Sequence, residues 1–307
     1  MKIVDLHCDT ISYLCSHPGS LANSQAQFDL VRARAADLVI QFMALFTMPG
    51  DSDSSLRQIL KQTERFLAEL EANSQTMYHV KHSGDLCSAE NSEKIGCILH
   101  VEGGECLGTD MEILRILYHS GLRSMSLTWN HRNLLADGVG EGKSAGGLSR
   151  LGKEVVKEMS RLGMMLDLTH ISPPSYYEAL DFYPGPVLVS HANARALCPH
   201  WRNLDDGQLR ILADHGGLIG ITQVADFIKE GHAGIDDMLD HIVYIADLVG
   251  VEHVALGSDF DGADNMVIGN VSGYSQLPAL LAKRGFTVPE IEMILSENAL
   301  RVIKQVI

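Results

Sequence analysis

The sequence lacks the marks of several protein classes. It has no apolar stretch of about 18 or more residues, so we expect no transmembrane helix and no membrane partner. Lys and Arg form no basic run, and the formal net charge of −15 argues against nucleic acid or an anionic membrane surface as a partner. The six cysteines form no Cys-x-x-Cys pair, which argues against a disulfide framework. We therefore expect a cytoplasmic globular protein with reduced, mostly buried thiols.

An alternation of apolar runs and helical patterns organises the 307 residues. Near-continuous apolar runs are typical of strands buried on both faces. Eight such runs occur, at residues 2–7, 37–46, 95–102, 124–129, 164–170, 186–191, 217–223 and 253–259. Helical spacing of apolar residues predicts helices at 54–72, 110–120, 150–162, 174–181, 204–215, 235–249 and 288–306. Asp53 or Ser54 is the expected N-cap of the first. This alternation of eight strand runs with helical segments predicts a single (β/α)8 barrel domain over residues 1–307.

The first apolar run ends in three polar residues at alternate positions. Residues two apart in a strand face the same side, so Asp5, His7 and Asp9 are expected together, with Leu6 and Cys8 on the other face. In a (β/α)8 barrel the chemistry lies at the C-terminal ends of the strands. Five of the eight predicted strand ends carry a side chain that can bind a metal ion, namely His7 with Asp9, Glu102, His170, His191 and Asp259.

Imidazoles and carboxylates without a thiolate cluster suit Zn²⁺, with Mn²⁺, Co²⁺ or Fe²⁺ as substitutes. Five candidate ligands are too many for one catalytic zinc, which takes three protein ligands and a water. They suit two ions, with His7 and Asp9 on one, His170 and His191 on the other, and Glu102 shared between them. Two such ions activate water and polarise a carbonyl group, which is the chemistry of hydrolysis.

Asp259 is the remaining acidic residue at a strand end. It is available to transfer a proton from the attacking water to the leaving group. The alternative is that Asp259 is a sixth metal ligand. Asp5 and Asp167 are candidate hydrogen-bond acceptors that orient the ligand imidazoles.

Several motifs occur in order from the first strand to the last helix: DLHCDT, HVEGG, LDLTHIS, VSHANARAL, WRNLDD, GSDFDG and SENALRVI. Together they resemble the membrane dipeptidase family, also called renal dipeptidase or peptidase family M19. The resemblance implies a (β/α)8 barrel with a binuclear zinc centre that hydrolyses dipeptides and tolerates a D-residue at the C-terminal position. The matching metal ligands are His7, Asp9, Glu102, His170 and His191, with Glu102 as the bridge. Asp259 matches the catalytic acid/base.

Arg202 matches the family arginine that binds the terminal carboxylate of the substrate. A guanidinium group holds a carboxylate through two parallel hydrogen bonds, so this residue would also select for substrate length. The alternative is an exposed arginine that pairs with Asp205 or Asp206. Relatives form dimers, so the resemblance also implies a homodimer.

The stretch LTWNHRNLLADG departs from the family pattern. Better-known members carry a His after the fourth strand that helps to polarise the scissile carbonyl, and Trp129 occupies that position here. His131, two residues later, either reaches the substrate in its place or is an ordinary loop residue.

Two other functions stay open. A related metal-dependent barrel hydrolase would act on a cyclic amide, a lactone or a deaminase substrate. Such enzymes commonly use a bridging modified lysine, and no Lys lies at a predicted strand end. A non-catalytic barrel that binds a metal or a peptide is expected to have lost a ligand or Asp259, and none is lost. The expected partner is therefore a small dipeptide.

Overall fold

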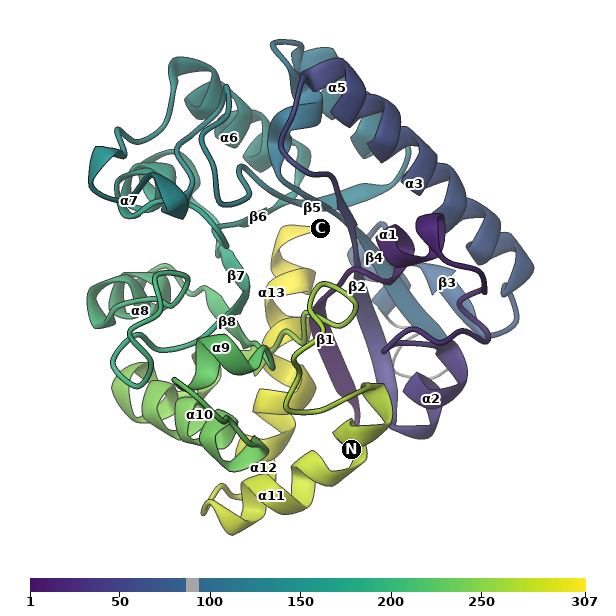
Figure 1. The fold of residues 1–307 in the computed structure, drawn as a ribbon, viewed down its shortest axis with the longest axis vertical. Helices are drawn as coiled ribbons and strands as arrows, with labels where there is room; N and C mark the ends of the chain where they lie inside the picture. Colours follow the sequence, from purple (N-terminus) through teal and green to yellow (C-terminus); the bar gives the residue numbers. More distant parts are fainter. Residues whose placement is uncertain (87–93) are drawn as a thin grey trace.

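Parallel strands close into a barrel in the computed structural model, which describes residues 1–86 and 94–307 (Figure 1). Within this part, the barrel strands are β1 (Ile3–Cys8), β2 (Leu38–Phe46), β4 (Ile95–Glu102), β5 (Leu122–Ser126), β6 (Met165–Asp167), β7 (Leu188–Ala192), β8 (Leu218–Ile221) and β9 (Val254–Leu256). Pairing of β2 with β4 and of β1 with β9 completes the ring. The predicted (β/α)8 fold is confirmed.

Helices surround the ring (Figure 1). In the described ranges they are α1 (Thr10–Ser16), α2 (Leu30–Ala35), α3 (Ser52–Ala72), α5 (Met111–His119), α6 (Arg150–Leu162), α7 (Pro173–Phe182), α8 (Asp206–Asp214), α9 (Ala225–Ile228), α10 (Ile235–Val249), α11 (Leu277–Lys283), α12 (Val288–Glu292) and α13 (Asn298–Val306). A π-helical turn, Met293–Glu297, joins the last two. The N-cap of α3 is Asp51, whose carboxylate accepts the Ser54 N–H at 2.9 Å, so the predicted cap was wrong.

Three strands, β5, β6 and β9, end before the apolar runs that predict them. Trp129, His170 and Asp259 therefore lie in the loops that follow β5, β6 and β9, beyond the last paired residue of each strand. A further strand, β3 (Met77–His79), was not predicted. It pairs with the first half of β4, on the edge where β5 pairs with the second half.

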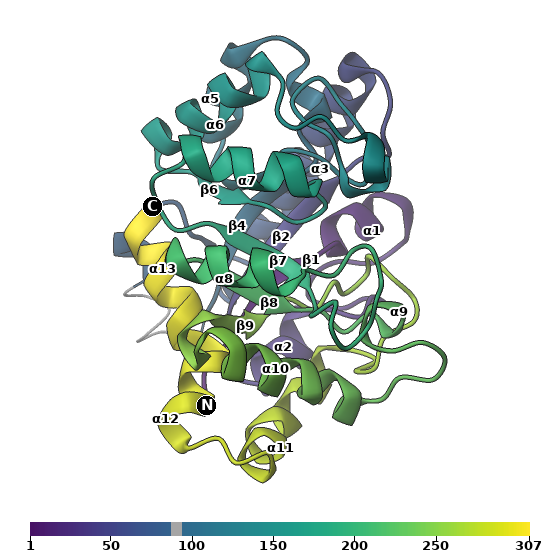
Figure 2. The same cartoon turned by 90° about the vertical axis from the view of Figure 1, so that its left-hand side faces the viewer.

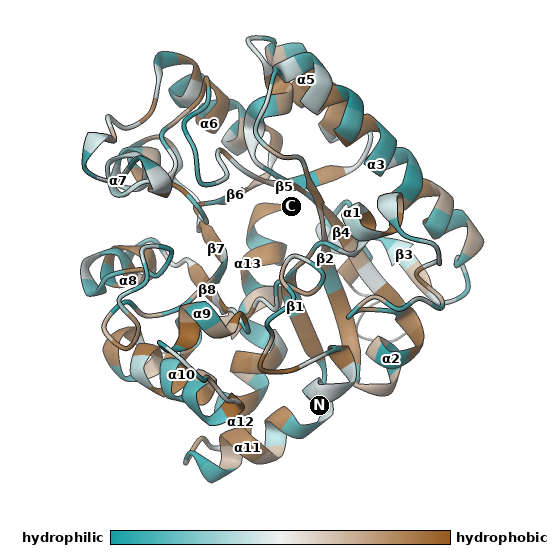
Figure 3. Ribbon diagram, viewed as in Figure 1, coloured by the Kyte–Doolittle hydropathy of each residue, from teal (hydrophilic) through white to brown (hydrophobic). Residues whose placement is uncertain are grey.

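The two ends of the barrel differ in character. At one end, Leu300, Val302 and Ile303 of α13 pack against strand residues such as Val4 and Leu218 in an apolar cluster. Figure 2 shows α13 at this end and α1 and α9 at the opposite end, where the strands finish. Apolar residues dominate the strands, while the outer helices alternate between apolar and polar positions (Figure 3). The apolar end seals the barrel, which leaves the other end for polar groups.

Two expectations from the composition, on membrane-spanning helices and on the cysteines, can be compared with the described residues. No helix among them combines the length and the apolar character that a membrane crossing requires. Five cysteines, Cys8, Cys15, Cys97, Cys106 and Cys198, have free thiols, and all but Cys15 are buried. Cys87, the sixth, lies outside the described residues.

An irregular register in β1 aims His7 into the barrel. Val4 and Leu6 belong to the interior cluster, so simple alternation would turn His7 outward. Asp5 pairs with Gln41 and Cys8 with Met43, so β1 advances by three residues where β2 advances by two. β1 therefore contains one extra residue, a β-bulge. His7 consequently faces inward beside Leu6, whereas Asp5 faces outward and accepts the Tyr274 hydroxyl at 2.9 Å. The prediction that Asp5, His7 and Asp9 share one face was therefore wrong.

The same device occurs in β7. Its register against β8 shifts between Val189 and Ala192, and the extra residue places both Ser190 and His191 on the inner side. This bulge brings the Ser190 carbonyl oxygen against Gly220 and Gly257. A Cβ atom built on either glycine would lie 2.1 Å or 1.7 Å from that oxygen. Glycine is required at both positions because of this close approach.

Replacing Gly257 by alanine is therefore expected to lower the free energy of unfolding by about 1–3 kcal/mol, the usual range for an overpacked core. Urea denaturation would measure the change. Gly269→Ala is the matched control, because Gly269 is exposed and an added Cβ would have no heavy atom within 4 Å. Equal stability of the two variants would show that the bulge of β7 relaxes at little cost.

Candidate metal centre

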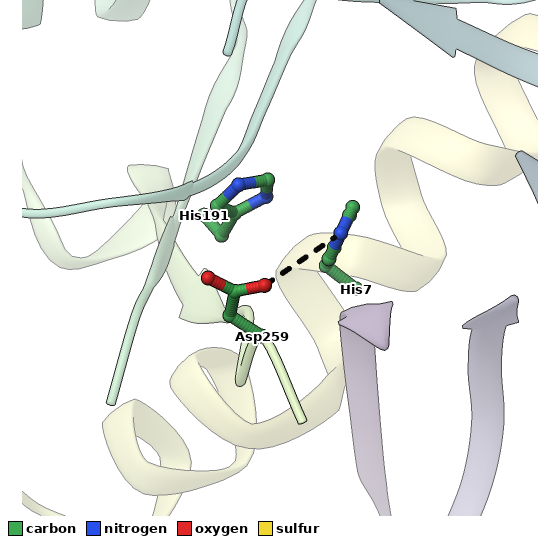
Figure 4. A group of neighbouring side chains, drawn as sticks. All are labelled: His7, His191 and Asp259. Carbon is green, nitrogen blue, oxygen red and sulfur yellow. Dashed lines mark ion pairs between the residues drawn. The ribbon is translucent and has the colours of Figure 1, made fainter. Parts of the chain in front are cut away.

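Six of the side chains singled out in the sequence converge at the open end of the barrel. They come from five strands or the loops that directly follow them, and they are His7, Asp9, Glu102, His170, His191 and Asp259. Figure 4 shows three of them, with a dashed line between His7 and the Asp259 carboxylate and with His191 beside them. All are buried except Asp259, whose side chain is 13% exposed. The structure thus brings together residues up to 252 positions apart, Asp259 − His7, in one polar cluster.

Glu102 occupies the middle of this cluster. Its Oε2 atom lies 3.6 Å from His7 Nε2, and its Oε1 atom lies 2.7 Å from His170 Nε2 and 3.7 Å from His191 Nε2. Asp9 Oδ2 lies 3.2 Å from His7 Nε2. Two candidate metal groups, His7–Asp9–Glu102 and Glu102–His170–His191, therefore share one carboxylate.

Asp259 lies next to His7 and His191. Its Oδ1 atom is 3.9 Å from His7 Nε2, and together with His7 and His191 it forms a third group that could hold an ion. Asp259 and His170 are held with φ near 67°, a left-handed conformation that non-glycine residues rarely adopt. Such backbone strain concentrates at functional sites, where surrounding structure holds the residue in place.

The carboxylates of the cluster repel one another. Burial and the charge of Glu102 raise the pKa of Asp9, and burial raises the pKa of Asp259 to about 8, with the charges of Asp9 and Glu102 adding to it. Burial opposes a charged imidazole at His7, but the charges of Glu102 and Asp9 outweigh it and raise the pKa of His7 well above its ordinary value. A bound cation would relieve this crowding.

The other two histidines are held neutral. Burial and the charge of Arg202 lower the pKa of His170 to about 4, and burial with the charge of His7 lowers the pKa of His191 well below its ordinary value. Their Nε2 atoms face each other at 3.0 Å. A neutral imidazole is the form that binds a metal ion.

Three observations fit a cation in this cluster. The donor set is imidazole and carboxylate, which divalent transition metals prefer. Within the described part of the chain, the buried Asp9 Oδ1 atom has no hydrogen-bond partner. Gly262 leaves room beside the carboxylates, because a Cβ on it would lie 2.3 Å from Asp259 Oδ1 and 2.5 Å from Asp9 Oδ2.

Hydrogen bonds from the surrounding residues orient the two neutral imidazoles. His170 Nδ1 lies 2.7 Å from the side-chain oxygen of Asn130. His191 Nδ1 lies 3.0 Å from the Ser190 hydroxyl, which donates to Asp167 at 2.5 Å, so Asp167 acts on His191 through Ser190. Such contacts select the tautomer and the ring orientation of a ligand histidine.

Asp5 does not orient an imidazole, contrary to the prediction. Its carboxylate accepts the backbone N–H groups of His7 at 3.2 Å and Ser258 at 2.8 Å, in addition to the Tyr274 hydroxyl. It therefore positions His7 and the segment leading to Asp259 through the main chain.

Arg202 is buried beside the cluster. Its Nη2 atom lies 3.3 Å from His170 Nε2 and donates to the His191 carbonyl oxygen at 3.3 Å. The Nε atom is buried and has no partner in the described ranges. Burial lowers the pKa of Arg202 to about 10, which leaves the guanidinium charged at neutral pH. The alternative pairing does not occur, because Asp205 lies near Arg195 instead and Asp206 accepts the Tyr244 hydroxyl.

A cavity of about 170 Å³ opens over the cluster. Besides the polar side chains, its lining includes Phe46, Trp129, Val224 and Phe227. His131 is exposed and does not occur among the described residues that line this cavity, although its ring lies 5.6 Å from that of Trp129. The structure thus brings Trp129 to the site and leaves His131 outside it.

Asn130 and Gly262 were missed in the sequence. Both line the cavity, Asn130 directly after Trp129 and Gly262 three residues after Asp259. Asparagine and glycine in a loop are ordinary turn residues, so their type carries no signal of function. Only their position after a strand end could have indicated a role.

Comparison with known proteins agrees with this architecture. The family model described as "Membrane dipeptidase (Peptidase family M19)" matches residues 1–307 of this chain. An uncharacterized dipeptidase of Schizosaccharomyces pombe is 35% identical over 300 residues, which cover 90% of this chain and 71% of that protein. Dipeptidase tcpJ of Claviceps purpurea is 32% identical, with coverage of 82% and 61%, so this chain spans about three fifths of that relative.

Solved structures show the same fold. A metallopeptidase described as dipeptidase AC of family M19 superposes with a TM-score of 0.93 at 25% identity, over 100% of this chain and 98% of the other. A metallopeptidase of Rhodobacter sphaeroides, solved with a phosphinate mimic of the dipeptide L-Ala-D-Ala, has a TM-score of 0.94 at 24% identity, with coverage of 100% and 99%. The chain belongs to the membrane dipeptidase family, the metallo-dipeptidases of peptidase family M19.

Proposed function

We propose that this protein hydrolyses the peptide bond of dipeptides with two divalent metal ions, of which Zn²⁺ is the expected one. The observation that carries the proposal is the central position of Glu102, whose two oxygens face different sets of histidines. His7, Asp9 and Glu102 would hold one ion, and Glu102, His170 and His191 the other. When bound, the ions polarise the scissile carbonyl and lower the pKa of water.

Asp259 is the proposed general acid/base. It is the most exposed member of the cluster, it lines the cavity, and burial raises its pKa to about 8 without the ions. A carboxylate at this position can take a proton from the attacking water and give it to the leaving amine. Asp259 also lies close enough to His7 and His191 to bind an ion with them, so the alternative role of a metal ligand needs a test.

Arg202 is the proposed binding residue for the terminal carboxylate of the substrate. Its buried Nε atom has no partner in the described structure, and its neighbours leave the guanidinium without a carboxylate of its own. A longer peptide would carry its terminal carboxylate away from this group. The small cavity, about 170 Å³, also favours a dipeptide.

Tolerance of a D-residue at the C-terminal position is part of the proposal. It follows from the family resemblance, and the ligand of the Rhodobacter sphaeroides structure makes L-Ala-D-Ala the natural first substrate. A cytoplasmic location and a homodimer stay predictions.

The two other functions find less support. In the described part of the chain, no lysine lines the cavity, so the bridging lysine of the cyclic-amide and lactone hydrolases has no counterpart there. A non-catalytic barrel would have no use for an acid/base such as Asp259 beside the cluster.

The first test is hydrolysis by zinc-loaded protein of L-Ala-D-Ala, L-Ala-L-Ala and L-Ala-L-Ala-L-Ala, with metal content measured on the same sample. We expect both dipeptides to be cleaved, the tripeptide to resist, and close to two ions per chain. Cleavage of the tripeptide would contradict the role of Arg202. Two ions without cleavage of any dipeptide would contradict the proposed reaction.

Asp259→Asn is expected to retain both ions and to lower kcat by about 10²–10⁴-fold, the usual contribution of general acid/base catalysis. Steady-state kinetics and metal analysis measure the two effects. Asp264→Asn, a change at an exposed aspartate five residues on, is the matched control. Loss of one ion from the Asp259 variant would make Asp259 a ligand.

Asn130→Ala is expected to lower metal affinity by about 10–100-fold, because it removes the acceptor that orients His170. Competition with a chelator measures the affinity. Asn130→Asp keeps an oxygen acceptor and should restore most of it, while Asn23→Ala, at an exposed asparagine, should leave it unchanged. Unchanged affinity in Asn130→Ala would mean that the backbone alone sets the His170 ring.

A further inference from the structure

The cavity has two apolar sides that belong to different parts of the barrel. Phe46 ends β2 and Trp129 follows β5, and these strands flank β4 in the ring. Val224 and Phe227 follow β8, which is separated from them by β6 and β7 in one direction and by β9 and β1 in the other. The two apolar sides therefore face each other across the metal cluster.

Phe46 and Trp129 form a continuous aromatic wall. Their ring centroids lie 5.4 Å apart at an angle of 55°, and the indole lies 6.0 Å from the His170 ring. Both side chains are partly exposed in the structure, so a ligand group placed on them would remove apolar surface from water. The indole N–H can only donate a hydrogen bond, so Trp129 cannot serve as a base.

Arg202 is not among the described residues that line the cavity; it lies behind His170 and His191, next to Phe227. Its guanidinium contacts the His191 carbonyl at the end of β7 and lies 5.5 Å from the Phe227 ring. On the proposed function, a dipeptide whose terminal carboxylate is held by Arg202 would place its C-terminal residue beside Phe227. With its scissile bond over the metal cluster, its N-terminal residue would extend towards the ends of β2 and β5.

We propose that Phe46 and Trp129 form the subsite for the side chain of the N-terminal residue, and that this subsite selects apolar side chains. The proposal rests on the proposed dipeptidase function. An apolar side chain gains contact with the two rings, whereas a charged one loses its hydration without gaining a charged partner on this wall.

The test uses the full-length, metal-loaded protein and two substrate series. In the first, the N-terminal residue of X-D-Ala is Gly, L-Leu or L-Lys. In the second, the C-terminal residue of L-Ala-X is Gly, D-Ala or D-Leu. We expect kcat/KM to be at least about tenfold higher for L-Leu-D-Ala than for Gly-D-Ala, as burial of a leucine side chain predicts. L-Lys-D-Ala should be poorer than L-Leu-D-Ala.

Trp129→Ala should lower the Leu/Gly ratio of the first series by about tenfold and leave the ratios of the second series nearly unchanged. Phe227→Ala, on the opposite side, should do the reverse. An equal fall for every substrate in Trp129→Ala would overturn the proposal, because it would assign Trp129 to the chemistry or to the fold. A wild-type preference for Gly or L-Lys would also overturn it.

A binding measurement separates the subsite from the reaction. The chain has only two tryptophans, so Trp201→Phe leaves Trp129 as the sole indole reporter. Phosphinate mimics of L-Leu-D-Ala and Gly-D-Ala should then change its fluorescence, with a Kd about tenfold lower for the first. Equal Kd values would overturn the subsite even if dipeptides are hydrolysed. A tenfold difference without any hydrolysis would support the subsite and contradict the proposed reaction.

Discussion

One extra residue in β1 and one in β7 turn His7 and His191 into the barrel, and the polar cluster depends on these two bulges. A regular strand alternates its side chains, so a strand with Leu6 or Leu188 inside the barrel turns every second residue away from it. The bulges cancel this alternation where the strands end and bring His7 and His191 inward. The close packing of the Ser190 carbonyl against two glycines belongs to the same distortion. The bulge in β7 therefore requires glycine at position 220 in β8 and at position 257 after β9.

The same geometry concentrates acidic groups where water is scarce. Asp9, Glu102 and Asp259 share one buried region, where burial, with the repulsion between the carboxylates adding to it, raises the pKa values of Asp9 and Asp259. Sites of this kind favour function at the expense of stability, because the fold must hold groups that repel one another. Asp5, Asp167 and Asn130 contribute by fixing backbone or imidazole orientation, so the cluster is positioned before any ligand arrives.

Much of this architecture could be predicted from residue patterns. Apolar runs identify the eight barrel strands, and their ends identify the polar residues that the structure brings together, since parallel strands deliver their ends to one face. The orientation of Asp5 could not be predicted, because a bulge has no reliable sequence signature. β3 has only three residues, too few for a recognisable strand pattern. The N-cap of α3 could not be assigned to Asp51 because Asp53 and Ser54, which follow it, are also favourable N-cap residues. Asn130 has an ordinary loop residue type, and its role depends on a contact 40 residues away.

The seam between β1 and β9 has a consequence for biosynthesis. The Asp5 carboxylate joins partners 253 and 269 residues further along the chain, and α13, which is made last, seals the apolar end of the barrel. At a translation rate of about 5–20 residues per second, β1 waits on the order of tens of seconds before its second neighbour emerges from the ribosome. During that time one edge of an apolar strand is open to pairing with other chains. A nascent chain of this topology therefore leaves that edge of its first strand unpaired until the last strand has been made.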